Sequence, residues 1–397
     1  MSEWKIAKLT EVAAVFNGKT PSKLEQRTEG HPVLKIKDVS ELGEYRGKFE
    51  SFVDPELATK FANKQVQEGD TLILNAAHSA DYVASKTYHA QPATFGALAT
   101  GEWLIVRPDR KALDAKFAHH WVNSTRTRYE LRDLVNGIHL YPKDVARLQI
   151  PLPPLEEQKR IAEILDRAEE LRSKRREAIA QLDTLIKAIF LEMFGNPVTN
   201  PKGFTIRKIK DLLESASYGT SEKSSSEGEF PVLRMNNITR SGEIDLTDLK
   251  YMDLADSQKE RYLVRSGDVL FNRTNSAELV GKTAIIRNIS SPMAFAGYLV
   301  RLRVNKENDP EYLSAFLNTD YSKRVLRGMC KSIIGMANIN ASEVQTIKIA
   351  QPPLHLQQEF ARRVEAVEKL KAAHRASLSE LDALFASLQH RAFRGEL

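Results

Sequence analysis

Two Gly-Lys-Thr triplets are the nearest match to a known catalytic motif in the sequence. They are Gly18–Thr20 and Gly281–Thr283. A phosphate-binding loop also needs a glycine five residues before the glycine of this triplet, because its backbone N–H groups must wrap around the phosphates. Ala13 and Ser276 occupy that position here. The sequence therefore does not support ATP or GTP hydrolysis by this chain.

The other chemically reactive residues form no recognisable catalytic set. His119 and His120 are adjacent, so on a helix they point in different directions, and no Cys or carboxylate completes a set of metal ligands. Cys330 is the single cysteine, which excludes an intrachain disulfide. No His-Glu-x-x-His, Gly-x-Ser-x-Gly or Gly-x-Gly-x-x-Gly motif occurs. We predict no catalytic residue, no metal site and no cofactor in this chain.

Length and composition narrow the class of protein. The 397 residues suggest two or three domains, and a single cysteine is typical of a reducing compartment. Lys and Arg number 58 against 52 Asp and Glu, a net charge of +6 that permits a polyanionic partner. No apolar run approaches the roughly 18 uninterrupted residues of a membrane span. We expect a cytoplasmic protein with no membrane partner.

The chain is a tandem duplication with a period of 199 residues. Pro153–Gln158 (PPLEEQ) returns as Pro352–Gln357 (PPLHLQ), and Leu182–Leu185 (LDTL) returns as Leu381–Leu384 (LDAL) at the same displacement. Solenoid repeats span only about 20–50 residues. Each copy is therefore expected to be a domain with its own core.

Each copy has two parts of different character. Residues 1–150 and 198–350 mix short apolar runs with turn residues, which predicts globular α+β modules. Residues 151–197 and 351–397 each contain a long segment of strong helix formers without Gly or Pro. We predict an α+β fold in which two duplicated globular domains are separated by a long antiparallel two-helix coiled coil, with pseudo-twofold symmetry.

Heptad counting predicts how the two long helices, Leu155–Phe194 and Leu354–Phe393, pair with each other. The second module connects the C-terminal end of the first helix to the N-terminal end of the second helix. We therefore expect an antiparallel pair, which places these two ends together. The predicted helix-pair interface consists of Ile161, Ile164, Leu171, Arg175, Leu182, Leu185, Ile189, Phe360, Val367, Leu370, His374, Leu381, Leu384 and Leu388. Arg175 and His374 differ by 199 residues, and we expect them to meet near the symmetry axis.

Two motifs and their repetition carry a family resemblance. Ile150–Ile161 (IPLPPLEEQKRI) and Ile349–Phe360 (IAQPPLHLQQEF) each follow a module and open a long helix, and the second module contains Ser266–Thr274 (SGDVLFNRT). With this duplicated pattern, the chain resembles the DNA-specificity subunit of type I restriction-modification systems over essentially its whole length. The first module departs from the pattern, because Asn75 stands where the second module has Arg273.

The resemblance implies a protein without catalysis of its own. In this family, residues 1–150 and 198–350 would be target recognition domains, each reading one half of a split double-stranded DNA target. Segments 151–197 and 351–397 would be spacer helices that set the unread distance and dock two adenine methyltransferase subunits. The complete complex adds two restriction subunits with motor activity. S-adenosylmethionine, ATP and Mg²⁺ are then expected on these partner subunits.

Base and phosphate contacts should come from basic and polar side chains on loops that follow strands. The candidates are Lys19, Thr20, Lys35, Lys37, Asn75, His78 and Lys86 in the first module, and Tyr218, Arg234, Asn236, Asn237, Arg273, Asn275 and Lys282 in the second. Since Asn75 and Arg273 differ, the two half-sites are expected to differ, and the target to be asymmetric.

Two other classes of protein stay open from the sequence alone. A scaffold could use the helix pair to join protein partners without binding DNA, although this leaves two basic duplicated modules without a purpose. A nuclease with an unrecognised carboxylate site would gain activity from Mg²⁺ alone.

Overall fold

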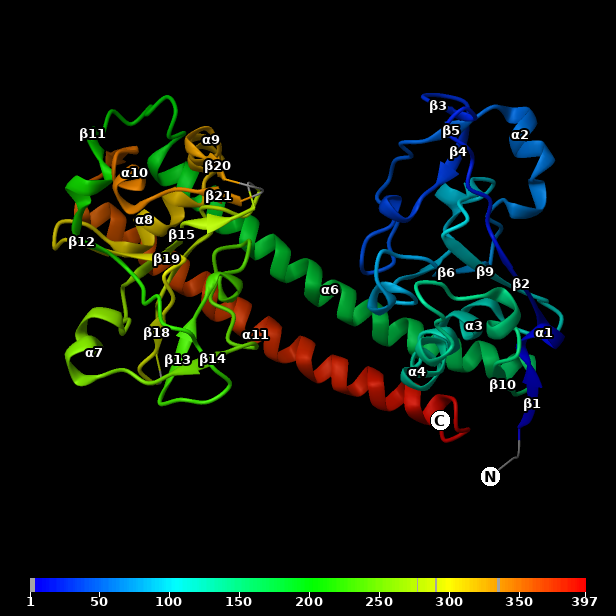
Figure 1. Ribbon diagram of the computed structural model, residues 1–397. Helices are drawn as coiled ribbons and strands as arrows, with labels where there is room; N and C mark the ends of the chain where they lie inside the picture. The colour runs from blue at the N-terminus through cyan, green and yellow to red at the C-terminus, as the bar shows by residue number, and fades with distance from the viewer. Residues whose placement is uncertain (1–3, 277, 290, 334–335) are drawn as a thin grey trace. The chain divides into compact units, whose positions relative to one another are not determined.

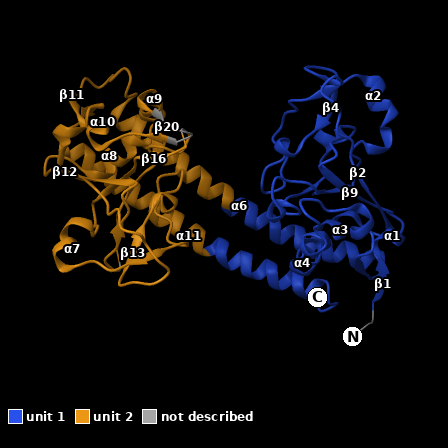
Figure 2. Cartoon of the chain, in the orientation of Figure 1, with its two compact units in different colours: residues 1–175, 377–397 blue, residues 176–376 orange. Residues whose placement is uncertain are grey.

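The computed structural model describes residues 4–276, 278–289, 291–333 and 336–397 (Figure 1). It divides into two compact units, residues 1–175 with 377–397 (unit 1) and residues 176–376 (unit 2) (Figure 2). Each unit contains one globular module and part of each long helix. The four-segment division of the sequence at residues 150, 197 and 350 stays a prediction, since the compact units cut both long helices.

An antiparallel four-stranded sheet forms the centre of the first module, in the strand order β2-β9-β6-β7. Its strands are β2 (Ala13–Asn17), β6 (Thr71–Leu74), β7 (Thr87–His89) and β9 (Trp103–Pro108). Alternate residues of a strand point to opposite faces, and the sheet is apolar on both. Ile73 and Leu104 therefore enter one buried cluster, while Leu72 and Ile105 enter another.

Smaller elements surround this sheet in unit 1. A second sheet has the order β3-β5-β4-β8, and β1 pairs antiparallel with β10. These strands are β1 (Lys5–Lys8), β3 (Gln26–Arg27), β4 (His31–Leu34), β5 (Phe52–Val53), β8 (Leu98–Ala99) and β10 (Gln149–Leu152). The short helices are α1 (Leu9–Val12), α2 (Pro55–Lys60), α3 (Ala115–Val122), α4 (Thr125–Asp133) and α5 (Pro142–Val145).

The second module repeats this plan. Its central sheet has the order β12-β19-β15-β17, a second sheet has the order β14-β13-β18, and β11 pairs with β22. The strands are β11 (Thr205–Lys208), β12 (Leu213–Tyr218), β13 (Phe230–Leu233), β14 (Lys250–Met252), β15 (Val269–Asn272), β17 (Thr283–Ile285), β18 (Ala294–Phe295), β19 (Leu299–Val304) and β22 (Lys348–Gln351). A further sheet has the order β16-β21-β20, formed by β16 (Thr274–Asn275), β20 (Lys331–Ile333) and β21 (Met336–Asn338). The helices are α7 (Asp256–Tyr262), α8 (Pro310–Leu317), α9 (Asp320–Met329) and α10 (Ala341–Gln345).

The two long helices are α6 (Leu155–Phe194) and α11 (Leu354–Ala392). The first matches the predicted segment at both ends, and the second ends one residue early. The prediction of an α+β fold with two modules and two long helices packed together is confirmed. Within the described residues, no helix is both long enough and apolar enough to cross a membrane.

A buried glutamine explains why each long helix starts where it does. Gln158 accepts a hydrogen bond from the Asp114 backbone N–H at 2.8 Å and donates to the Pro153 carbonyl, also at 2.8 Å. Gln357 repeats this in unit 2, accepting from Asp309 at 2.9 Å and donating to Pro352 at 2.8 Å. Both glutamines are fully buried. They connect the first turn of each long helix to the N-cap of α3 or α8, and so to the module that precedes it.

The long helices pair in an antiparallel sense within each unit, and an ion pair crosses the seam. In unit 1, Arg172 Nε lies 2.6 Å from Asp382 Oδ1. In unit 2, Lys371 Nζ lies 2.5 Å from Asp183 Oδ1. Arg172 and Lys371 are equivalent in the duplication, as are Asp183 and Asp382. The same interaction is therefore made twice, with the helices exchanging roles.

The heptad prediction of the seam is wrong in detail near these ion pairs. Leu171, Leu185, Leu370 and Leu384 were expected inside the interface, but each is 43–50% exposed. The buried positions of α6 run Ile161, Leu165, Ala168 and then the partly buried Arg172, which is one residue beyond the heptad position. Drift of a seven-residue count on a straight helix, about 20° per heptad, is too small to explain this offset, which is already present at Leu165 in the first heptad. The expected contact of Arg175 with His374 joins the two units and stays a prediction.

Lys371 is the most enclosed cation of the seam. Its side chain is 1% exposed and is also paired with Glu243 and Glu368. Burial alone would lower the pKa of Lys371, but the hydrogen bonds that it donates to Asp183 and Glu243 raise it. Because Glu243 belongs to the second module, this ammonium group connects the module to both long helices.

We expect Lys371→Ala to destabilise unit 2 by about 3 kcal/mol, the lower end for breaking a buried ion pair, because it removes a buried ammonium group from three partly buried carboxylates. Urea unfolding followed by circular dichroism measures this loss. Lys369→Ala is the matched control, since Lys369 is 75% exposed and should change stability by about 0.5 kcal/mol or less. Equal losses of unfolding free energy in the two variants would show that the ion pairs of Lys371 stabilise unit 2 no more than an exposed ion pair does.

Candidate nucleic-acid interface

The structure brings three predicted DNA-binding residues of the first module to one shallow pocket. Its volume is about 320 Å³, and its lining includes Thr20, Lys35, Lys37, Gln26 and Glu102. Lys35 Nζ donates to Gln26 Oε1 at 3.3 Å, and Lys37 pairs with Glu50. The residues follow the ends of β2 and β4, so the ends of two strands bring a hydroxyl and two ammonium groups to the same surface.

Two further candidates of this module are exposed. Lys19 Nζ lies 5.2 Å from the centroid of the Phe61 ring. The imidazole of His78 lies 4.8 Å from the ring of Tyr82. Both side chains are open to solvent, and neither lines the pocket.

Asn75 and Arg273 occupy the same place in the two modules. The Asn75 backbone N–H donates to Glu102 O at 2.9 Å, and that of Arg273 donates to Tyr298 O at 3.0 Å. Asn75 is buried, and its amide donates to Gly101 O at 3.0 Å. Arg273 is instead partly exposed, although its Nε is buried and has no hydrogen-bond partner among the described residues. The predicted equivalence is thus present in the structure, although the two side chains present different groups.

Arg273 and Tyr218 form an aromatic and cationic pair on the second module. The guanidinium carbon of Arg273 lies 4.8 Å from the centroid of the Tyr218 ring. The Tyr218 hydroxyl accepts a hydrogen bond from the Ala341 backbone N–H at 2.9 Å, which fixes the ring. A fixed ring under a guanidinium holds it in one orientation, as bidentate readout of a base requires.

Lys86 and Lys282 both point into the interior of their modules. Lys86 is buried and donates to the carbonyl of Val39 at 3.1 Å. Lys282 donates to the carbonyl of Met235 at 2.8 Å, and burial together with nearby Arg240 lowers its pKa. Each ammonium group therefore holds the short 3-10 turn that follows β4 or β13.

The remaining candidates of the second module differ in exposure. Asn237 is buried, and its amide donates to Asp245 O at 2.8 Å and Asp248 O at 2.9 Å. Arg234 Nη2 lies 2.8 Å from Asp248 Oδ2. Asn236 is exposed, and Asn275 Oδ1 accepts from the backbone of Ser276 at 2.9 Å. Asn237 thus holds the turn from which Asn236 extends.

Sequence reasoning missed a second pair of cations that support the same loops. Arg128 of α4 donates to the carbonyl of Ser85 at 3.0 Å, and Lys323 of α9 donates to that of Gly281 at 2.6 Å. Burial and neighbouring cations lower the pKa of Lys323 to about 8. Each residue lies four positions after its helix N-cap, Ser124 or Thr319, and this shared offset is the signal that could have identified them.

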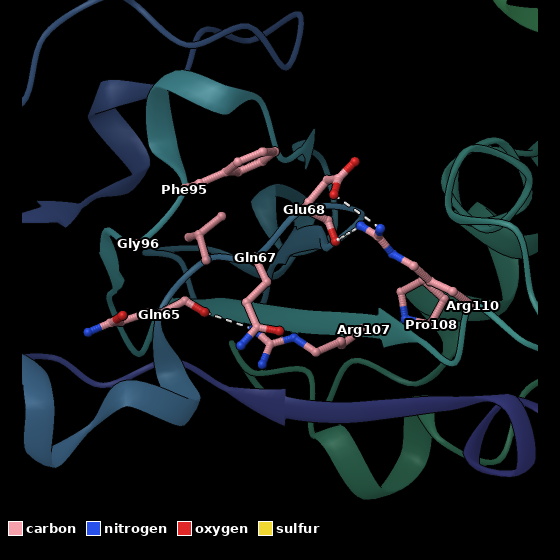
Figure 3. Close-up of a pocket in the computed structure, with 9 residues that line it drawn as sticks. Gln65, Gln67, Glu68, Phe95, Gly96, Arg107, Pro108 and Arg110 are labelled. Atoms are coloured by element: carbon pink, nitrogen blue, oxygen red, sulfur yellow. Dashed lines mark hydrogen bonds and ion pairs between the residues drawn. The ribbon is translucent and has the colours of Figure 1, made fainter.

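A larger depression of about 570 Å³ on the first module does not include any predicted residue. Figure 3 shows Arg107 directed toward Gln65 and Arg110 toward Glu68. Arg107 Nη2 donates to Gln65 O at 2.7 Å, and Arg110 Nη1 lies 3.1 Å from Glu68 Oε2. These cations stabilise the turn that precedes β6, and we do not include this depression in the interface.

The adjacent histidines that the sequence raised as possible ligands lie in the interior of unit 1. His120 Nε2 lies 2.8 Å from Asp166 Oδ1, which connects α3 to α6. His119 lies between His120 and His89, with ring centroids 5.9 and 5.0 Å away. Burial, and then the nearby His89 and His120, hold the pKa of His119 well below its usual value. In the part of the chain that the structure describes, no group of three His, Cys, Asp or Glu residues could hold a metal ion.

Both repeats match the family model of the type I restriction modification DNA specificity domain, over residues 1–181 and 201–383. The chain therefore belongs to this family, and the resemblance found in the sequence is confirmed. It is a DNA specificity subunit of a type I restriction-modification system.

Known relatives and a solved structure match almost the full length of this chain. The chain is 24% identical to the type I restriction enzyme EcoKI specificity subunit of Escherichia coli strain K12, covering 99% of this chain and 89% of that protein. It is 22% identical to the StySPI specificity subunit of Salmonella potsdam, with the same coverage. The type I S subunit from M. genitalium shares the fold with a TM-score of 0.55 at 14% identity, covering 98% of this chain and 96% of the other.

We expect the stability of unit 1 to fall as the pH drops below about 6.5, the usual pKa of histidine. The unfolded chain takes up a proton at His119 below that pH, whereas the folded unit does not. Each such group lowers the free energy of unfolding by up to about 1.4 kcal/mol per pH unit. Urea unfolding followed by tryptophan fluorescence measures this, because Trp4, Trp103 and Trp121, the three tryptophans of the chain, all lie in unit 1.

The control for this pH dependence is His119→Gln, which removes the titrating ring. Its unfolding free energy should change less than that of the native chain between pH 7.5 and 5.5. An unchanged pH dependence in this variant would assign the effect to other groups.

Proposed function

We propose that this chain is a non-catalytic subunit in which each module reads one half of a split, asymmetric DNA target. The observation that carries this proposal is the duplication itself, since two modules with the same scaffold differ at the position of Asn75 and Arg273. A shared scaffold supports the same mode of DNA binding in both modules. A guanidinium supported at this place in one module, and a side chain satisfied internally at the same place in the other, support different base preferences.

The contacting residues that we propose are the members of the predicted set that are exposed or partly exposed and whose polar groups are not all satisfied inside the modules. They are Lys19, Thr20, Lys35, Lys37 and His78 in the first module, and Tyr218, Arg234, Asn236, Arg273 and Asn275 in the second. Asn75, Lys86, Asn237 and Lys282 are left out because their polar groups are already satisfied inside the modules. Their role is to hold the turns from which the others extend.

The long helices are proposed to set the spacer and to dock two adenine methyltransferase subunits. Each unit exposes one leucine from each helix beside its cross-helix ion pair: Leu171 and Leu384 in unit 1, and Leu370 and Leu185 in unit 2. Exposed apolar side chains that gather on a surface often mark a protein contact. Because the duplication produces the set twice, two copies of one partner could bind equivalent surfaces.

Catalysis is assigned to the partner subunits in this proposal. The methyltransferase subunits would bind S-adenosylmethionine, and two restriction subunits would use ATP and Mg²⁺. This division of labour is supported by the absence from the sequence of the nucleotide-binding and hydrolase motifs considered above.

The first test maps methylated sites in DNA from cells that carry this chain with the methyltransferase encoded beside it. We expect a split motif with a modified adenine in each half. Arg273→Ala should relax one half only, by about 1–3 kcal/mol at the base that it reads, and leave the other half unchanged. Lys369→Ala, which alters an exposed cation of the spacer, serves as the control. Methylation that persists unchanged when the chain is deleted would refute the proposal.

A second test addresses the docking surfaces separately from DNA recognition. The double substitution Leu171→Asp with Leu384→Asp should remove one of two bound methyltransferase subunits, and Leu370→Asp with Leu185→Asp should remove the other, because a carboxylate opposes burial of the surface. Native mass spectrometry counts the subunits. Leu24→Asp is the control, since Leu24 is 88% exposed and lies outside the helices. Retention of both subunits by the double variants would place the docking surface elsewhere.

A further inference from the structure

Unit 2 contains a cavity of about 600 Å³ between the second module and the long helices. Its walls come from the unit 2 parts of α6 and α11, from α8 and the start of α9, and from the loop around Gly242. Cavities of this size commonly hold small molecules. The cavity is separate from the predicted DNA-binding residues, none of which lines it.

Comparison of the two repeats explains why the cavity exists. The N-caps Asp114 and Asp309 fix the alignment of α3 with α8, so His119 and His120 correspond to Ser314 and Ala315. The 199-residue displacement likewise aligns Phe385 with Ile186. In unit 1 the His120 and Phe385 rings lie 6.3 Å apart and fill the space between α3 and α11.

In unit 2 the corresponding side chains are small. Ser314, Ala315 and Ile186 all line the cavity. Three truncated side chains at one place in one repeat thus leave open the volume that the other repeat fills.

A buried hydrogen-bond acceptor at this cavity lacks a donor. Asn123 and Asn318 are equivalent C-cap residues of α3 and α8. In unit 1, Asn123 Oδ1 accepts from Thr87 Oγ1 at 2.7 Å and from Arg128 Nη2 at 2.8 Å. In unit 2, Asn318 lines the cavity, and its Oδ1 is buried with no partner among the described residues.

The donors are absent because the equivalent residues of unit 2, Thr283 and Lys323, bind a different acceptor. Thr283 Oγ1 and Lys323 Nζ both donate to the carbonyl of Gly281. A buried acceptor without a donor costs about 1–3 kcal/mol, so a ligand that supplies an N–H or O–H group here would gain affinity.

Five cations and five carboxylates line the cavity, so its formal charges balance, but most of the groups without an ion pair are cations. Arg287 pairs with Glu311, and Lys371 pairs with Asp183, Glu243 and Glu368. Among the described residues, no hydrogen bond or ion pair is made by the exposed cations Lys187, Arg240 and Arg324, against one unpaired carboxylate, Asp320. The apolar part of the wall includes Phe190, Val364 and Ala315.

We propose that this cavity binds a small amphipathic anion, namely an aromatic or branched apolar group that carries a carboxylate or similar anion and an N–H or O–H donor. The apolar group replaces the His120 and Phe385 rings of unit 1, the anion faces Lys187, Arg240 and Arg324, and the donor binds Asn318 Oδ1. The ligand contacts the module and both long helices of unit 2. One such site is present per chain, because unit 1 fills the equivalent volume.

The probe for this site is indole-3-acetate, which combines an aromatic ring, a carboxylate and an N–H group. Isothermal titration of the full chain should give one saturable site. The uncharged 3-methylindole tests the need for the anion, and 1-methylindole-3-acetate tests the need for the donor. Each analogue should bind about tenfold more weakly or worse.

Two variants locate the site. Ala315→His restores the ring that unit 1 has and should abolish binding. Arg240→Ala should weaken binding of indole-3-acetate about tenfold while leaving 3-methylindole unaffected; because Arg240 is exposed and unpaired, this variant keeps the test decisive even if Ala315→His fails to fold. Lys369→Ala is the control and should bind normally.

The proposal fails if indole-3-acetate does not bind, or if Arg240→Ala binds it as tightly as the native chain. It also fails if folded Ala315→His retains the site. None of these outcomes bears on DNA recognition, so the methylation map tests that function independently.

Discussion

The buried glutamine in the first turn of each long helix is the contact on which the rest of each unit depends. Gln158 and Gln357 bind the backbone that begins α3 or α8 and the proline carbonyl before their own helix. An isolated helix of this length is not held at any angle to the module before it. Because a buried amide must satisfy both its donor and its acceptor, the glutamine fixes that angle. The Pro-Pro-Leu-x-x-Gln motif that revealed the duplication is therefore a structural joint.

The joint explains how a sequence motif positions a distant surface. Once α3 and α8 are fixed to the long helices, the helices that follow them, α4 and α9, lie against the loops after β6 and β15. Arg128 and Lys323 then hold these loops, and Lys86 and Lys282 hold the turns after β4 and β13. The exposed residues that we propose for DNA contact extend from this series of supported turns. The positions of these exposed residues depend on cations that face inward. Part of the positive charge of the modules therefore stabilises the fold.

The fold was largely predictable from the sequence, whereas the roles of individual residues were not. Long segments without Gly or Pro determine α6 and α11 almost to the residue, because helix formation depends on local sequence. The burial of Lys86 or Asn75 depends instead on which carbonyls lie nearby in the folded module, and these come from residues tens of positions away. Pattern alone cannot separate a lysine that faces DNA from one that holds a turn.

The helix seam shows the same limit in a different form. The heptad count placed Leu171 and Leu370 inside, whereas the side chains that cross the seam are those one residue later, Arg172 and Lys371. Long cationic side chains can cover an apolar seam with their methylene groups while their charged ends reach a carboxylate. The displaced leucines then face solvent in both units, so one shift in register produces both the buried ion pairs and the exposed apolar surfaces.

The two repeats differ where a module meets the long helices. At the junction in unit 1, His120 binds Asp166 of α6 and its ring lies 6.3 Å from that of Phe385 of α11, whereas Ala315 lines a cavity at the same place in unit 2. The second module remains joined to the long helices because Tyr312 packs against Phe190 and Phe194, and because Glu243 pairs with Lys371 and Arg375. A duplicated chain can thus fill the space at one junction and leave it open at the other, since aromatic packing and ion pairs beside the open volume hold the second junction.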